Sequence, residues 1–200
     1  MYTFESPRRD HGLDHSKPGA TAMSLTESEF TSLRGTIALR GTVRMALLPV
    51  TVLGWALVAV LLLLFGDQPV AVLFPLAVLI GGFEAIHALH VGGERIGRYL
   101  QVFYEGAPDA PRWETTAMAV GPALPGGGID PLFSVVFIST ALANLIPAFT
   151  PGPTRPELAV LLPLHFAFIV RVVRARGAAA RQRAVELESY RAIKTQTPTG

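Results

Sequence analysis

The chain has 200 residues, of which half are hydrophobic and only 16% are charged, and its mean hydropathy is +0.41. Soluble domains carry about a quarter charged residues, so this composition argues against an ordinary water-soluble domain. The absence of cysteine excludes disulfides, thiolate metal sites, iron–sulfur clusters and cysteine nucleophiles. The formal net charge is +2, and the basic residues are unevenly distributed along the chain.

The first 44 residues precede any long apolar run. Residues 1–23 are rich in Pro, Gly, Ser, His and charged residues, which predicts a disordered tail. Ser24-Leu25-Thr26-Glu27 has the form of a helix-capping box, and apolar residues follow it at helical spacing. We therefore expect residues 24–44 to form a short amphipathic helix that lies on the inner membrane surface.

Four apolar segments predict an all-α fold, an integral membrane bundle of four transmembrane helices. The first segment is an uncharged run of 21 residues, about 31 Å long as a helix, and a bilayer hydrocarbon core is about 30 Å thick. The fourth segment is short and reaches full length if its arginines snorkel to the interface. The predicted spans are residues 45–65, 70–91, 132–149 and 158–173, in a domain 45–194 that a disordered tail 195–200 follows.

The connections between these segments predict the topology. The links 66–69 and 150–156 are short and contain helix breakers, so each joins an antiparallel pair of helices. Of the 17 basic residues, only Arg155 lies in these links. The positive-inside rule therefore predicts a multi-pass protein of the cell inner (cytoplasmic) membrane with both termini in the cytoplasm.

Two of the helices are expected to extend beyond the bilayer. After the second span no strong breaker appears until Gly106, so the second helix is predicted to continue to about Glu105. The fourth helix is predicted to continue through an alanine-rich segment to about Lys194. The two extensions should then lie side by side in the cytoplasm.

One face of the second helix carries a continuous row of polar side chains. At about 100° per residue these positions fall within about one third of the helix circumference. Ionisable groups are costly in lipid, so the row is expected to face other helices or water. Glu94 and Arg98 are four residues apart and are expected to pair. The members within the span are Glu84, His87 and His90, and the cytoplasmic polar stripe consists of Glu94, Arg98, Gln101 and Glu105.

The rise per residue places one polar group of each span at a similar depth, about 9–12 Å from the inner boundary. This coincidence predicts a buried polar layer centred on Glu84 and His165, and we expect these two side chains to face each other across the bundle. The predicted layer consists of Thr51, Glu84, His87, Ser139, Thr140 and His165.

Three functions are compatible with such a layer. No catalytic motif is recognisable, so the first hypothesis is a non-catalytic accessory or assembly subunit that works with other membrane subunits or as a homo-oligomer. In that case no cofactor is needed. A proton-coupled transport component is a further hypothesis, because a glutamate beside histidines can relay protons. Nucleic acid is not an expected partner, since basic residues do not alternate with aromatic ones.

The remaining hypothesis is a haem-binding or metal-binding membrane protein. Over about ten residues, the Glu84-x-x-His87 and His87-x-x-His90 spacings resemble those of ferritin-like and cytochrome b bundles. A di-iron site would need further carboxylates that the other spans lack, whereas haem b would need only two neutral imidazoles on facing helices. The candidate ligands for haem b or a divalent metal are Glu84, His87, His90 and His165.

Overall fold

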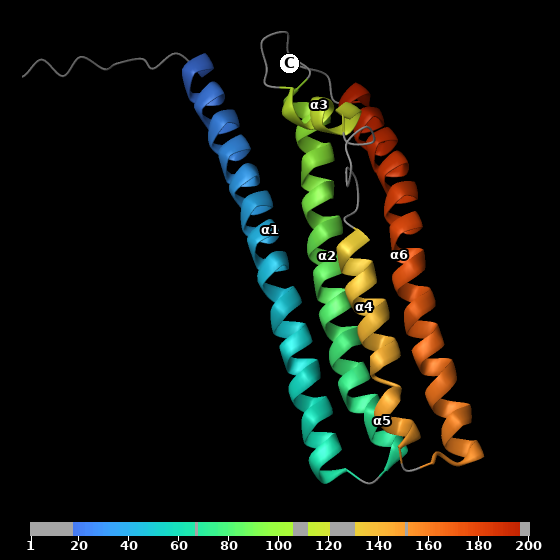
Figure 1. The fold of residues 1–200 in the computed structure, drawn as a ribbon. Helices are drawn as coiled ribbons and strands as arrows, with labels where there is room; N and C mark the ends of the chain where they lie inside the picture. Colours follow the sequence, from blue (N-terminus) through green and yellow to red (C-terminus); the bar gives the residue numbers. More distant parts are fainter. Residues whose placement is uncertain (1–17, 67, 106–111, 121–130, 151, 197–200) are drawn as a thin grey trace, which may run out of the picture.

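The computed structural model describes residues 18–66, 68–105, 112–120, 131–150 and 152–196, and its regular elements are all helices (Figure 1). Three long helices run side by side, with a shorter interrupted helix between two of them. The elements are α1 (Pro18–Phe65), the 3-10 helix η1 (Pro69–Val72), α2 (Leu73–Phe103), α3 (Trp113–Val120), α4 (Pro131–Ala143), α5 (Ile146–Phe149) and α6 (Arg155–Gln196).

Three helices are long and apolar enough to cross a membrane, and they lie in the segments Glu27–Phe65, Pro69–Phe103 and Arg155–Gln196. The all-helical fold predicted from the sequence is confirmed. The predicted third span is different, because it consists of α4 and α5 with a break at Asn144 and Leu145. Its apolar part is about 26 Å long at helical rise, which is shorter than the hydrocarbon core. The described residues therefore contain three helices long and apolar enough to span a membrane and one short, interrupted helical segment.

The N-terminal segment also differs from the prediction. Residues 24–44 were expected to form a separate surface helix, but they are the N-terminal part of α1, which continues without a break into the first span. Contacts with α2 and α3, such as the ring contact of Phe30 with Tyr104, hold this part of α1 against the bundle. Residues 18–23 and 195–196 are helical, and the rest of the two predicted tails lies outside the described residues.

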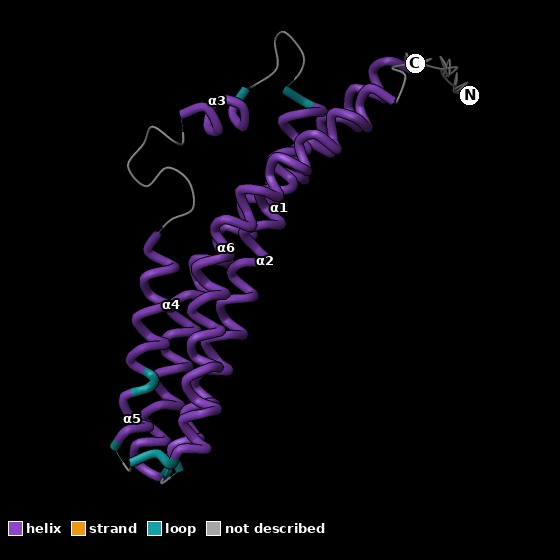
Figure 2. Tube along the Cα trace, turned by 90° about the vertical axis from the view of Figure 1, so that its right-hand side faces the viewer, coloured by secondary structure: helices purple, strands orange, loops and turns teal. Residues whose placement is uncertain are grey.

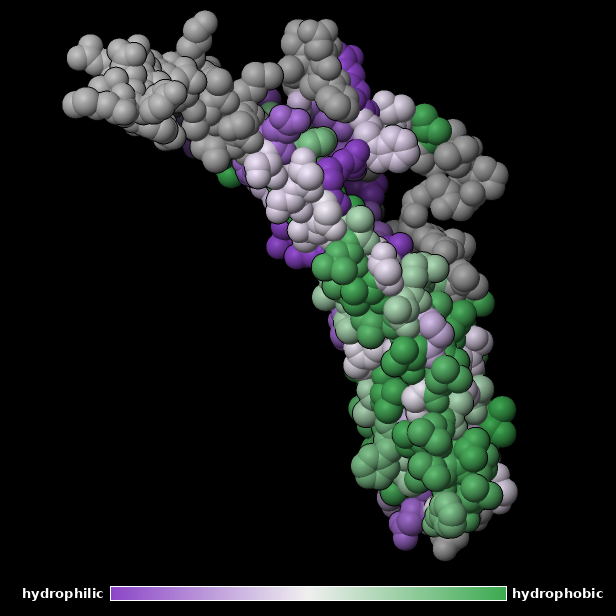
Figure 3. Space-filling model, turned by 90° about the vertical axis from the view of Figure 1, so that its left-hand side faces the viewer, coloured by the Kyte–Doolittle hydropathy of each residue, from purple (hydrophilic) through white to green (hydrophobic). Residues whose placement is uncertain are grey.

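The long helices continue well beyond the apolar region. At helical rise the 42 residues of α6 extend about 63 Å, roughly twice the thickness of a hydrocarbon core. The first residues of α1 and the last residues of α6 lie at the same end of the molecule (Figure 1). This end is hydrophilic and the opposite end is apolar (Figure 3), and the three long helices bend together between them (Figure 2). We call the hydrophilic end the stalk, defined as residues 27–44, 92–105, 113–120 and 174–196.

Aromatic side chains form the centre of the apolar core. The ring of Phe83 on α2 meets Phe137 on α4 and Phe168 on α6 edge-on, at centroid distances of 5.3 and 5.9 Å. Edge-to-face pairs of this kind stabilise a core beyond the area that they bury. Leu79 and Val172 are fully buried beside them. α1 instead exposes most of its apolar side chains, which suits a lipid-facing helix.

The contact between α1 and α2 depends on Gly82. The side chain of Thr51 occupies the space that a side chain at position 82 would need, whereas Gly81 has open space at the equivalent point. We expect Gly82→Ala to lower the free energy of unfolding by about 1–3 kcal/mol, because overpacking forces α1 to move. Unfolding in mild detergent, followed by circular dichroism, measures the loss.

Gly81→Ala is the matched control for this substitution. It makes the same chemical change one residue away, and it should be neutral or stabilising by up to about 1 kcal/mol through helix propensity. Equal losses from the two alanine variants would contradict a packing role for Gly82.

Candidate functional site

Asn144 connects the helices inside the apolar part of the molecule. Trp55 Nε1 on α1 donates to Asn144 Oδ1 at 3.0 Å. The two N–H groups of the amide serve two acceptors, the carbonyl oxygen of Val72 at 2.8 Å and His165 Nε2 at 3.0 Å. Asn144 and His165 are each only 1% exposed. We call Trp55, the Val72 carbonyl, Asn144 and His165 the amide node.

His165 is held through both ring nitrogens. Its Nδ1 lies 2.8 Å from the carbonyl oxygen of Leu161, which can only accept a hydrogen bond, so Nδ1 carries the proton. Nε2 is then the acceptor for the Asn144 amide. The arrangement suits a neutral imidazole that joins α6 to the break between α4 and α5.

The break between α4 and α5, where Asn144 lies, has a local cause. Pro147 has no backbone N–H, and in a continuous helix its ring would clash with the carbonyl of Ala143. The backbone tightens instead, and the N–H groups of Leu145 and Ala148 donate to carbonyls three residues earlier. Asn144 is not among the residues predicted from the sequence. The available signal was that it is the only asparagine of the chain and lies in an apolar segment.

The predicted polar layer is not one connected cluster. Glu84 does not face His165, because its carboxylate accepts a hydrogen bond from Arg171 Nη2 at 2.8 Å. Both side chains of this ion pair are more than 40% exposed. His87 stacks on the ring of Phe83. The hydroxyls of Ser139 and Thr140 donate to carbonyls of their own helix, and Thr51 packs at Gly82.

The difference between the predicted polar layer and the structure has a geometric reason. Depth along a helix follows from the rise per residue, but the direction of a side chain depends on how the helix is rotated about its axis. Of the predicted layer, only Thr51, Thr140 and His165 are buried. Within the apolar part, the described residues form the amide node and the separate Glu84–Arg171 ion pair instead of one layer.

Arg98 is the centre of a second polar cluster, in the stalk. Its side chain is only 4% exposed, and it lies between two carboxylates. Nη1 donates to Glu94 at 3.0 Å, so the predicted pair within α2 forms. Nε and Nη2 donate to Glu186 on α6 at 2.8 and 2.6 Å. Arg98 thereby joins α2 to α6.

Further side chains surround both carboxylates. Arg183 on α6 donates to Glu94 at 2.9 Å, and Arg95 and Gln182 donate to Glu186 at 3.0 and 2.7 Å. Burial of Glu186 favours its protonated form, but the hydrogen bonds from Gln182 and the two arginines outweigh burial and hold the pKa of this carboxyl below its ordinary value. The ion-pair network consists of Glu94, Arg95, Arg98, Gln182, Arg183 and Glu186.

The other members of the predicted stripe lie near α3. Glu105 accepts hydrogen bonds from the backbone N–H groups of Glu114 and Thr115 at 2.6 and 2.8 Å, so its carboxylate caps the start of α3. Arg34 on α1 pairs with Glu114 at 2.8 Å. Burial raises the pKa of Glu114, with opposition from Arg34 and a further contribution from Glu105. Gln101 lines a small cavity beside the ion-pair network.

The candidate metal ligands do not converge on one point. Among the described residues there is no group of three or more His, Asp or Glu side chains that could hold a metal ion. His90 Nδ1 lies 2.7 Å from Arg44 Nη1, His87 contacts Phe83, and His165 belongs to the amide node. A bis-histidine haem would require His165 to give up its hydrogen bond from Asn144.

The fold and the polar clusters together define a helical protein with helices long and apolar enough to cross a membrane and with a hydrophilic stalk. The chain matches no family model, and neither a curated protein nor a solved structure is significantly similar to it.

Proposed function

We propose that the protein is a non-catalytic, multi-pass protein of the cytoplasmic membrane that serves as an accessory or assembly subunit of a membrane complex. The observation that carries this proposal is the stalk. It continues the spanning helices far beyond the length that a bilayer requires, and it is cross-linked by buried ion pairs. Helices that only anchor a protein need no such extension.

The contacts in the stalk favour a rigid platform for another protein. Arg98 and Arg183 connect α2 with α6, and Lys194 Nζ donates to the carbonyl of Val102 at 2.5 Å near the far end. Arg34 ties α1 to α3. A pre-organised surface loses little conformational entropy on binding, so it suits a docking role. Val185 and Trp113 are each 63% exposed there and offer apolar contact area.

The alternative functions have weaker support. Ligation of haem or a metal would require His87, His90 and His165 to leave their present partners. A proton relay through Glu84 would have to compete with its ion pair to Arg171. No contact of the described residues favours either function over the non-catalytic one.

The proposed orientation places both ends of the described chain in the cytoplasm. Reporter fusions at Gln68, between α1 and α2, and after Gln196 should report opposite sides of the membrane, because basic residues are concentrated away from the short links. Reporter enzymes that are active on only one side of the membrane measure this. The same side for both fusions would reject the orientation.

The docking role can be tested by the size of the native complex. We expect the protein, extracted in mild detergent, to migrate as part of a larger complex, and Val185→Asp to release it by placing a charge in an apolar contact. Leu39→Asp is the matched control within the stalk, because Leu39 is equally exposed, at 64%, but lies on α1, away from the apolar contact area at Val185 on α6. Native electrophoresis measures the size. A wild-type protein that migrates alone, or a Val185→Asp complex as large as that of Leu39→Asp, would contradict the docking role.

A further inference from the structure

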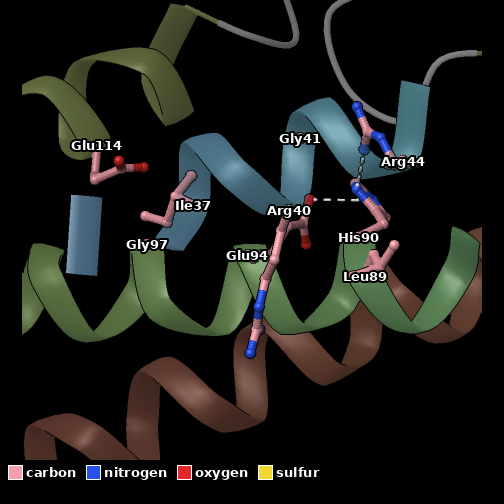
Figure 4. A pocket seen from close by; sticks show the side chains of 10 residues that line it. Ile37, Arg40, Gly41, Arg44, Leu89, His90, Glu94, Gly97 and Glu114 are labelled. Carbon is pink, nitrogen blue, oxygen red and sulfur yellow. Dashed lines mark hydrogen bonds and ion pairs between the residues drawn. The ribbon is translucent and has the colours of Figure 1, made fainter. Parts of the chain in front are cut away.

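A cavity of about 240 Å³ lies between α1 and α2 (Figure 4). Arg40 and Arg44 line it from α1, and His90 and Gly93 line it from α2. Arg44 directly precedes the uncharged run of α1, so the cavity lies where the apolar span ends. In the proposed membrane orientation, on which the inference rests, this is the level of the inner-leaflet phosphate groups.

The two arginines bring positive charge that is not neutralised by a carboxylate. Among the described residues, neither Arg40 nor Arg44 forms an ion pair with Asp or Glu. Arg44 instead donates to His90, and its guanidinium lies 5.4 Å from the centroid of the Phe133 ring. The carboxylates that also line the cavity are already engaged, because Glu94 pairs with Arg98 and Arg183 and Glu114 pairs with Arg34.

Two buried donors beside the cavity lack a hydrogen-bond acceptor. They are Arg44 Nε and His90 Nε2. Because Arg44 donates to His90 Nδ1, the proton of a neutral His90 lies on Nε2, which makes Nε2 a donor. The nearest carboxylate oxygen, on Glu94, is 3.4 Å away and does not form a hydrogen bond with it. Buried donors are almost always paired, and among the described residues Arg44 Nε has no acceptor at all.

Glycines give the arginines and a ligand the necessary space. The guanidinium of Arg40 occupies the position that a side chain at Gly92 would need, and Figure 4 shows Arg40 reaching across α2. Gly41 and Gly93 both line the cavity and have open space where a Cβ would lie. Ile37 and Leu89 add an apolar part to the wall.

We propose that this cavity binds the phosphate group of an anionic phospholipid of the inner leaflet. Guanidinium groups bind phosphate oxygens through paired hydrogen bonds, so Arg40 and Arg44 supply the donors. A basic pocket between helices at the cytoplasmic interface is a known type of lipid headgroup site. The apolar wall suits the glycerol and the first methylene groups of the lipid.

The test is thermal unfolding of the purified full-length protein in mild detergent with added phosphatidylglycerol, phosphatidylcholine or inorganic phosphate. We expect phosphatidylglycerol to raise the Tm saturably, and phosphatidylcholine and inorganic phosphate to have little effect. Replacing Arg40 and Arg44 together by Gln should weaken the apparent affinity for phosphatidylglycerol at least about tenfold, because two charge-assisted contacts are lost. The Tm of this variant in phosphatidylcholine reports whether it still folds.

Two pairs of variants distinguish a specific binding site from non-specific electrostatic attraction between the anionic lipid and the protein. Replacing Arg174 and Arg181 together by Gln removes the same two charges from exposed positions on α6 and should preserve the affinity. Gly41→Leu should fill the cavity and weaken binding, whereas Gly35→Leu, on the same helix with equally open space, should not. Because the protein is purified without partners, the outcome is independent of the complex-size test.

Each contrary result is informative. If inorganic phosphate protects as well as phosphatidylglycerol and depends on the same arginines, the lipid assignment is overturned. No effect of phosphatidylglycerol overturns the site itself. So does an effect that the Arg174 and Arg181 double variant reduces as much as the Arg40 and Arg44 double variant does.

Discussion

Arg98→Met should lower the free energy of unfolding by about 3 kcal/mol. The substitution leaves Glu94 and Glu186 partly buried without their shared cation, and breaking a buried ion pair from one side typically costs about 3–5 kcal/mol. The expected value is at the lower end, because Arg183 and Arg95 still contact the two carboxylates. Reversible unfolding in mild detergent, followed by circular dichroism, measures the loss.

Arg95→Met is the matched control for Arg98. Arg95 donates to the same carboxylate, Glu186, but its side chain is 54% exposed, so its loss should cost less than about 1 kcal/mol. Adding Glu186→Gln to Arg98→Met should recover part of the stability, since the amide carries no charge that needs a partner. Equal losses for the two single variants would show that the buried position of Arg98 has no special role.

Asn144→Leu is expected to have the second largest effect, a loss of about 2–3 kcal/mol. Three hydrogen bonds are removed at once, and each is worth about 0.6–2 kcal/mol between membrane helices. Trp55 and His165 also keep polar atoms that no longer have a partner in apolar surroundings. Unfolding in mild detergent measures the loss of stability.

Two further measurements test this explanation. In a Trp113→Phe background, Trp55 is the only tryptophan, so its fluorescence emission should change when its indole loses the Asn144 acceptor. Ser139→Ala is the control on α4, because the Ser139 hydroxyl bonds only to its own helix, and it should cost less than about 0.5 kcal/mol. A stable Asn144→Leu protein with unchanged emission would contradict a role for the amide in joining the helices.

The amide node and the ion-pair network differ in how far they were predictable. The pairing of Glu94 with Arg98 follows from their spacing on one helix, which places the two side chains one turn apart. The partner on the other helix, Glu186, could not be derived in this way. It lies 88 positions later in the chain, and its approach depends on how α2 and α6 are rotated and aligned.

The error about Glu84 has the same origin. Counting residues gave Glu84 and His165 similar depths, but equal depth does not decide whether two side chains face each other. In the structure Glu84 pairs with Arg171, and His165 turns toward Asn144. Which of these contacts forms depends on the rotation of each helix about its axis, and that rotation is determined by packing against the core rather than by a local pattern.

The sequence by itself determined the helical class of the protein, three of the four predicted apolar helices and the extension of two of them past the length that a bilayer requires. These properties depend on hydropathy and helix periodicity, which act between residues that are near in the chain. Only the tertiary structure decided that α1 is one continuous helix, that Asn144 joins four segments and that Arg98 joins α2 to α6. Such contacts depend on the alignment of helices distant in sequence, where packing and the pairing of buried polar groups select the partners.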